Sequence, residues 1–123
     1  MERAIRVLLV EDNDVYRLSL EFLLDRYDGL EVVGSVAMGS AAATACSELE
    51  ADVVVIDYRL PDMDGSEVAA ELRERCLEAS VVFLSASAGR DETAAAQAAG
   101  VALVRKDEGV EVLVGAVRAA MEG

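Results

Sequence analysis

The chain has 123 residues, enough for one domain with a hydrophobic core and too few for two, so a single domain over residues 1–123 is expected. Hydrophobic residues make up 54% of the sequence and charged residues 28%, a balance typical of a soluble globular protein. No apolar run approaches the ~20 residues of a membrane span, and the N-terminus does not resemble a secretory signal. A cytoplasmic protein with no membrane attachment is therefore expected.

The net charge is strongly negative, because 24 acidic side chains stand against 11 basic ones and give a formal charge of −13. A domain this acidic repels a phosphate backbone, so direct binding of DNA or RNA is not expected. It remains suited to binding cations or partners with a basic patch. The acids are scattered along the chain, and most of them are expected to form an ordinary solvated surface.

The two cysteines lie in segments of helical composition. Cys46 and Cys76 form no CxxC motif, and the chain contains no histidine. They suggest neither a disulfide framework nor a zinc site. We expect both to be small apolar residues of the core.

Short β-branched runs alternate with segments of helical composition along the whole chain. This alternation predicts βαβ units and a parallel sheet, with strands over residues 5–10, 30–36, 53–57, 81–84 and 101–104. The runs VLLV and VVVI are apolar at every position, as expected of strands covered by helices on both faces. With right-handed crossovers the fold class is α/β, a three-layer sandwich.

Five helices are expected between and after the strands, over residues 15–27, 41–49, 66–75 and 91–99, and along the stripe Leu113, Ala116, Val117, Ala120 and Met121. Asn13 or Asp14 can N-cap the first helix, which carries Val15, Leu18 and Phe22 on one face.

The helix over residues 91–99, ended by Gly100, contains no large apolar residue. It buries little area, so it should be held weakly and be a candidate for movement.

Polar residues stand where the predicted strands end. The first strand ends in Glu11 and Asp12, the third in Asp57, the fourth in Ser85 and the fifth near Lys106. Ligands of open parallel sheets bind beyond these carboxyl ends. If the first and third strands are neighbours, three carboxylates meet, and they repel one another unless a cation such as Mg²⁺ lies among them.

The acids also have a simpler interpretation, since Glu11 and Asp12 precede a helix whose N-terminus favours negative charge. Asp57 is harder to explain in this way, because it ends a buried apolar run. A carboxylate can attack a phosphoryl donor and form an acyl phosphate, whose charge must then be neutralised. Mg²⁺, the ammonium of Lys106 and the hydroxyl of Ser85 can supply that neutralisation, although singly each side chain could be an ordinary surface residue.

Taken together, these residues resemble a known family. The acidic pair Glu11-Asp12, Asp57, the following LPDMDG of residues 60–65, Ser85-Ala86 and Lys106 match a response-regulator receiver domain of bacterial two-component signalling. The resemblance spans all five βα units. It implies a flavodoxin-like sheet in the order 2-1-3-4-5, in which the first and third strands adjoin.

The resemblance also implies the roles of the site residues. A sensor histidine kinase would transfer a phosphoryl group to Asp57. Mg²⁺ would be held by Asp12, Asp57 and the backbone carbonyl of Arg59, with Glu11 acting through water. Ser85 and Lys106 would contact the phosphoryl group.

Switching would then shift the fourth and fifth βα units. In this family Gly65 belongs to the turn after the phosphorylation site and is expected to take a backbone conformation that other residues resist. Receivers usually carry Tyr or Phe three residues before the lysine, but this chain has Leu103 there. Ser85 and Leu103 are therefore the residues expected to change conformation on phosphorylation.

Asp107 follows the lysine in place of a frequent proline, which favours the branch joined to helix-turn-helix DNA-binding domains. A C-terminal DNA-binding domain or separate effector, and a homodimer on phosphorylation, are partners that this branch allows. The signal, the kinase and the controlled pathway are left open.

Two other functions fit parts of the pattern. A docking module that keeps the fold but works without phosphorylation is left open by Leu103. A haloacid-dehalogenase-like phosphohydrolase also uses an aspartyl nucleophile at a strand end, but it needs a second aspartate two residues later, where this chain has Arg59.

Overall fold

The fold is built on one parallel sheet in the order β2-β1-β3-β4-β5, which confirms the predicted topology. The computed structural model describes residues 3–76 and 78–122. Within them the strands are β1 Ile5–Val10, β2 Leu30–Val36, β3 Val53–Asp57, β4 Ser80–Ser85 and β5 Ala102–Arg105. The first three match their predicted bounds, β4 is one residue longer at each end, and β5 lies one residue further along the chain.

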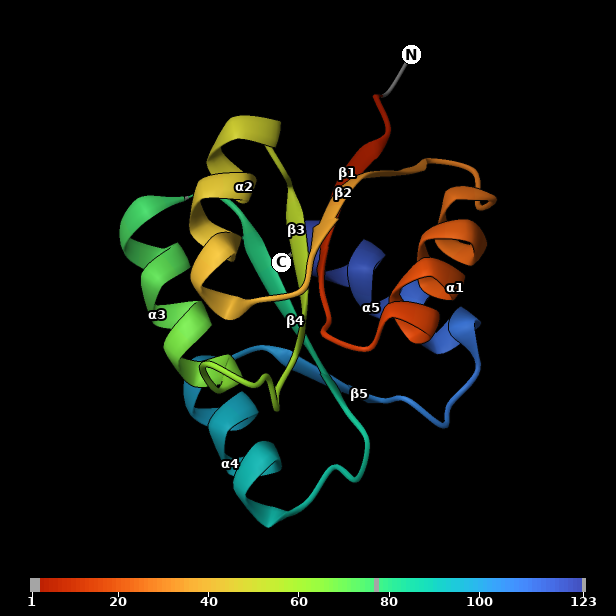
Figure 1. Cartoon of the computed structure of the whole chain (residues 1–123). Coiled ribbons are helices and arrows are strands. Elements are labelled where there is room, and N and C mark those ends of the chain that lie inside the picture. The colour runs from red at the N-terminus through yellow and green to blue at the C-terminus, as the bar shows by residue number, and fades with distance from the viewer. Residues whose placement is uncertain (1–2, 77, 123) are drawn as a thin grey trace.

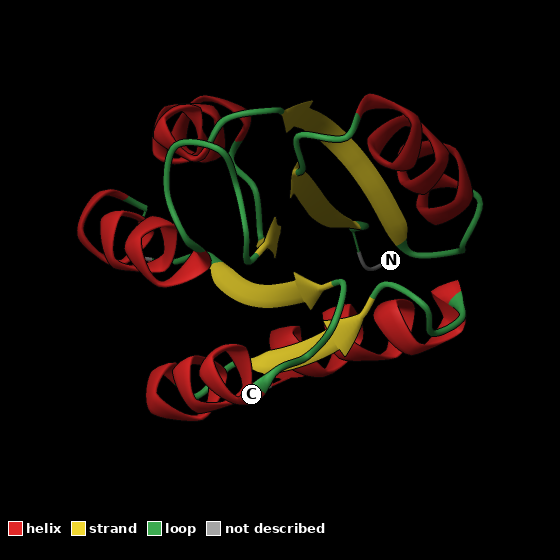
Figure 2. Ribbon diagram, turned by 60° about the horizontal axis from the view of Figure 1, so that its bottom comes forward, coloured by secondary structure: helices red, strands yellow, loops and turns green. Residues whose placement is uncertain are grey.

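Helices cover both faces of the sheet (Figures 1 and 2). They are α1 Asp14–Asp25, the short 3₁₀ helix η1 Gly39–Ala41, α2 Ala42–Leu49, α3 Gly65–Arg75, α4 Arg90–Ala99 and α5 Val110–Glu122. Helices α1 and α5 pack on one face, and α2, α3 and α4 lie on the other, which confirms the three-layer sandwich. Among the described helices, none combines the length and apolar character that spanning a bilayer requires.

The two central strands are buried on both faces, as their continuous apolar runs predicted. Alternate side chains of β1 and β3 point to opposite layers. Those facing α2 and α3 are Leu8, Val10, Val54 and Ile56, and those facing α1 and α5 are Val7, Leu9, Val53 and Val55.

Helix α1 turns a different face to the core from the one that its first apolar residues suggested. Asn13 caps the helix, with its side chain accepting from the N–H of Tyr16 at 2.9 Å. Leu20 and Leu24 are buried, whereas Val15, Leu18 and Phe22 are mostly exposed. The sequence carries two apolar stripes on one helix, and only packing against the sheet decides between them.

Because α1 buries Leu24 and exposes Phe22, truncating each of these side chains to alanine should destabilise the domain by different amounts. Leu24 is fully buried and Phe22 is 63% exposed, with the Arg26 guanidinium over its ring. Leu24→Ala should lower the free energy of unfolding by at least about 2 kcal/mol, and Phe22→Ala should change it by less than about 1 kcal/mol. Urea denaturation followed by circular dichroism measures both. The reverse ranking would mean that the predicted face is the buried one.

Helix α5 shows a smaller deviation from its predicted stripe. Leu113 and Val117 are buried, but Met121 is exposed and Val114 is buried in its place. The buried stripe is therefore shifted toward the beginning of the helix.

Gly65, at the start of α3, is needed for space and not for an unusual backbone conformation. Described residues with positive φ are Gly29, Glu50, Ala88 and Gly100, so the expected conformation at Gly65 is wrong. A Cβ at Gly65 would lie 2.8 Å from Cδ1 of Tyr58 and 3.1 Å from its Cα. The glycine therefore lets α3 approach the end of β3 closely, which is another common use of this residue.

Asp62 ties the loop after β3 to the start of η1. Its carboxylate accepts the backbone N–H groups of Gly39 and Ser40, each at 2.9 Å. These bonds lower the pKa of Asp62, with the Ser40 N–H as the largest cause.

A lowered pKa makes the contribution of Asp62 depend on pH in a definite direction. The stabilisation is present above the ordinary aspartate pKa and is lost as the pH falls through the lower folded-state pKa. Asp62→Asn should therefore lower the urea midpoint at pH 7, and the gap to the wild type should close on acidification. A gap that stayed constant with pH would contradict the ionic origin of the contact.

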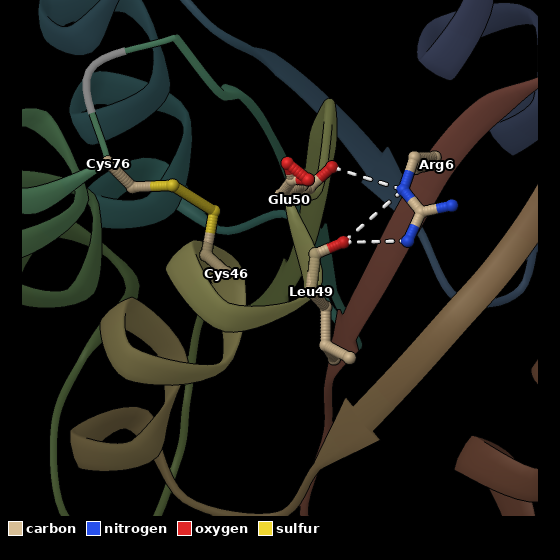
Figure 3. Close-up of a disulfide and its surroundings, with 5 residues drawn as sticks. All are labelled: Arg6, Cys46, Leu49, Glu50 and Cys76. Carbon is tan, nitrogen blue, oxygen red and sulfur yellow. Dashed lines mark hydrogen bonds between the residues drawn. A yellow bond between two sulfur atoms is a disulfide. The ribbon is translucent and has the colours of Figure 1, made fainter.

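Cys46 and Cys76 are joined by a disulfide, which contradicts the expectation of two unpaired core cysteines (Figure 3). Cys46 is fully buried in α2, and Cys76 lies directly after α3 with its Cα 6.6 Å from that of Cys46. The cysteines are 30 residues apart, so only the packing of α2 beside α3 brings them together. Beside them, the Arg6 guanidinium donates to the carbonyls of Leu49 and Glu50 at the end of α2.

Candidate functional site

Three carboxylates gather at the carboxyl edge of the sheet. Val10 of β1 lies opposite Ile56 of β3, so the residues that follow them are neighbours. Glu11, Asp12 and Asp57 each offer an oxygen within 4.8 Å of the others. Glu11 is 1% exposed and Asp57 is 5% exposed, whereas Asp12 is open to solvent. The strand order therefore brings together the acids that the sequence had placed at separate strand ends.

Lys106 brings a positive charge to two of these acids. Its Nζ donates to Asp57 Oδ2 at 3.1 Å and lies 2.6 Å from Glu11 Oε1. The backbone N–H of Lys106 donates to the carbonyl of Ser85 at 2.8 Å, which fixes the start of the loop after β5. The ammonium also lies 4.8 Å from the centre of the Tyr16 ring, a distance typical of a cation–π contact.

Burial and charge act on these groups in opposite directions. Burial raises the pKa of Glu11, the nearby Asp57 adds to the rise, and the Lys106 ammonium and the N–H of Asn13 only partly oppose it. Burial lowers the pKa of Lys106, but the two carboxylates outweigh that effect, so the net pKa is raised and the ammonium form is favoured. The charged lysine is thus the counter-charge of a crowded acidic pair.

The donor set fits a hard divalent cation. Glu11 Oε2 accepts the N–H of Asn13 at 2.8 Å. Among the described buried side-chain atoms, Glu11 Oε1 is the one without a hydrogen-bond partner, because its contact with Lys106 lacks hydrogen-bond geometry. This oxygen is in an ion pair with Lys106 but keeps its hydrogen-bond capacity beside two further carboxylates. Mg²⁺ prefers carboxylate oxygens of this kind together with several waters.

Ser85 follows Leu84, the residue of β4 that lies opposite Asp57, but its hydroxyl does not donate to Asp57. Its Oγ donates to Glu92 Oε2 at 3.2 Å, and no hydrogen bond joins it to Asp57 in the described part of the chain. Arg59 links the carboxylates of Asp57 and Glu92. Its backbone N–H donates to Asp57 Oδ1 at 3.2 Å, and its Nη2 donates to Glu92 Oε1 at 3.1 Å.

Leu103 stands opposite Phe83 in the pairing of β4 with β5. It is partly buried and packs against the core between the sheet and α2, α3 and α4. Strand β4 lies between Leu103 on β5 and Asp57 on β3, and the role of Leu103 as a switch residue stays a prediction.

Two residues near the site were missed from the sequence. Glu92 is buried within the first turn of α4, and Tyr16 lies under Lys106. An acid in the first turn of a helix is so common that it carries no signal for burial. The sign that Glu92 matters is its contact with Ser85 and Arg59, which only the folded chain reveals.

Comparison with known proteins identifies the family. The model of the response regulator receiver domain matches residues 7–118. The response regulator protein VraR of Staphylococcus epidermidis is 32% identical over 121 residues, covering 98% of this chain and 58% of VraR. The chain thus spans a little over half the length of this relative.

Solved structures agree with the sequence match. The signal receiver domain of the response regulator NarL from Mycobacterium tuberculosis superposes with a TM-score of 0.90 at 29% identity, covering 99% of both chains. A LuxR-family two-component response regulator from Aurantimonas gives a TM-score of 0.89 at 28% identity, covering 98% of this chain and 86% of the other. The chain belongs to the response regulator receiver domain family of two-component systems.

Proposed function

We propose that this domain accepts a phosphoryl group on Asp57 from the phosphohistidine of a sensor histidine kinase. The carboxylate oxygen of Asp57 attacks phosphorus, the phosphorus–nitrogen bond of the donor breaks, and an acyl phosphate forms. The observation that supports this most directly is the meeting of the buried Asp57 and Glu11 with the exposed Asp12 and the Lys106 ammonium. The domain catalyses this transfer on itself, and water later cleaves the acyl phosphate to free Asp57 and release inorganic phosphate, without turnover of a metabolite.

Mg²⁺ would be held by Asp12, Asp57 and the backbone carbonyl of Arg59, with Glu11 acting through water. When bound, the cation neutralises charge on the phosphoryl oxygens during transfer. Lys106 would remain a point charge that donates to Asp57 Oδ2 and keeps the carboxylate oriented.

The consequence of phosphorylation would be a rearrangement of the α4-β5-α5 surface, in which Ser85 and Leu103 take part. The net charge of −13 argues against direct nucleic acid binding by this domain. A DNA-binding output domain, as in LuxR-family regulators, or a separate effector would respond to the rearranged surface. The phosphorylated domain could act in this way as a monomer or as a homodimer. A cytoplasmic location suits all these partners.

The test is an adduct measurement on the protein with a small phosphodonor and millimolar Mg²⁺. The wild type should gain ~80 Da, as expected for one phosphoryl group, and Asp57→Asn should gain nothing. Beryllofluoride should likewise perturb amide resonances around Asp57 in the wild type only. A wild type that takes neither reagent would overturn the proposal and favour the phosphorylation-independent docking module.

A further inference from the structure

The hydroxyl of Ser85 is fully engaged in this structure. A serine hydroxyl has one proton to donate, and here Ser85 donates it to Glu92 Oε2 at 3.2 Å. Its oxygen accepts the N–H of Ala88 at 2.7 Å and the N–H of Ser87 at 3.2 Å. Ser85 therefore cannot donate to a phosphoryl oxygen on Asp57 until it leaves Glu92.

Glu92 is a buried carboxylate that joins three segments of the site. It is 4% exposed and lies in the first turn of α4. Besides Ser85, it accepts from Ser87 Oγ at 3.1 Å and from Arg59 Nη2 at 3.1 Å. These bonds connect the loop after β3, the loop after β4 and helix α4, so displacement of one of these segments alters the contacts of the other two.

The loop held by this network has an unfavourable backbone conformation. Ala88 has φ of +49°, a region that a residue with a Cβ rarely occupies. Such conformations persist where the surrounding contacts enforce them. Here the Ala88 N–H donates to Ser85 Oγ at 2.7 Å, and the Ala88 carbonyl accepts from Thr93 Oγ1 at 3.3 Å. Movement of Ser85 would remove the shorter of these two contacts just before α4.

We infer that Glu92 is a positioning residue that holds the Ser85 hydroxyl away from Asp57 while the domain is unphosphorylated. On phosphorylation the Ser85 hydroxyl keeps its proton but changes its hydrogen-bond acceptor, from Glu92 Oε2 to a phosphoryl oxygen, and α4 loses one of its contacts with the sheet. This inference rests on the proposed phosphorylation of Asp57. The competing explanation is that Glu92 only stabilises the N-terminus of α4, as acids there commonly do.

The test compares affinities for beryllofluoride in the presence of Mg²⁺, measured by titrating amide resonances. Glu92→Gln keeps the shape but replaces a charged acceptor with a weaker neutral one, so its affinity should rise about fivefold. Asp91→Asn is the matched control, because it removes the same charge from an exposed position in the same turn, and it should match the wild type.

A double-mutant cycle separates positioning from helix stabilisation. In a Ser85→Ala background, Glu92→Gln should no longer raise the affinity, because there is no hydroxyl to release. An unchanged or lower affinity for Glu92→Gln, or a gain that persists without Ser85, would overturn the inference. Thermal unfolding of each variant shows that it is folded.

A second measurement keeps the two proposals apart. In the unliganded protein, Glu92→Gln should speed hydrogen exchange of the Ala88 amide, and Asp91→Asn should not. If the wild type does not bind beryllofluoride but this exchange difference is seen, the phosphorylation proposal fails and the holding contact stands. If the exchange difference is absent, the role of Glu92 is refuted whatever the phosphorylation result.

Discussion

Lys106→Met is expected to destabilise the Mg²⁺-free domain by about 2 kcal/mol, although the replacement is apolar and similar in length. Removing one partner of a buried ion pair typically costs about 3–5 kcal/mol because it leaves an uncompensated buried charge, and the partial exposure of Lys106 reduces this through solvent screening. Glu11 and Asp57 would remain buried side by side without their ammonium. Urea denaturation of the metal-free protein at pH 7 measures the loss.

Two controls test that explanation. Arg105→Met changes the net charge equally at the exposed neighbouring position and should alter stability by no more than about 0.5 kcal/mol. Asp57→Asn combined with Lys106→Met should recover most of the loss, since one of the two unpaired carboxylates is then gone. A Lys106→Met variant as stable as the wild type would show that the lysine does not balance the acidic pair.

Reducing the Cys46–Cys76 disulfide is the second change with a large expected effect. A closed loop spanning 30 residues restricts the unfolded chain. The chain-entropy relation gives about 3–4 kcal/mol for a loop of this size. The oxidised protein should therefore have a clearly higher urea midpoint than the same protein in excess dithiothreitol.

Cys46→Ser supplies the control for that comparison. It should resemble the reduced wild type in stability and should not respond to dithiothreitol. Beryllofluoride binding should be almost the same in both redox states, since the disulfide is at the far end of α2 and α3 from Asp57. A urea midpoint that did not depend on reductant would argue against a stabilising disulfide.

The sheet was predictable because its central strands are apolar at every position. Only burial on both faces accounts for such runs, and helices between them require parallel pairing. Polar residues at the ends of parallel strands then share one edge of the sheet. The approach of Asp57 to Glu11 also requires β1 beside β3, a strand order that the resemblance to receiver domains implied. The chemical roles of these residues remain predictions.

What the sequence could not show depends on packing between distant segments. Phe22 and Leu24 are equally apolar, and the sheet selects Leu24 for burial. The pairing of Cys46 with Cys76 depends on how α2 lies against α3. Glu92 reads as an ordinary first-turn acid until Ser85 and Arg59 are seen to contact it.

The alanine-rich surface of α4 has a mechanical consequence. When a helix moves off a core, the cost is set largely by the cavities that its side chains leave behind, at about 24 cal/mol per Å³. The buried apolar residue of α4 is Ala96, whose methyl group leaves almost no void. Lateral sliding of α4 over the sheet therefore requires little repacking, and the few polar ties at its first turn set the threshold for that motion.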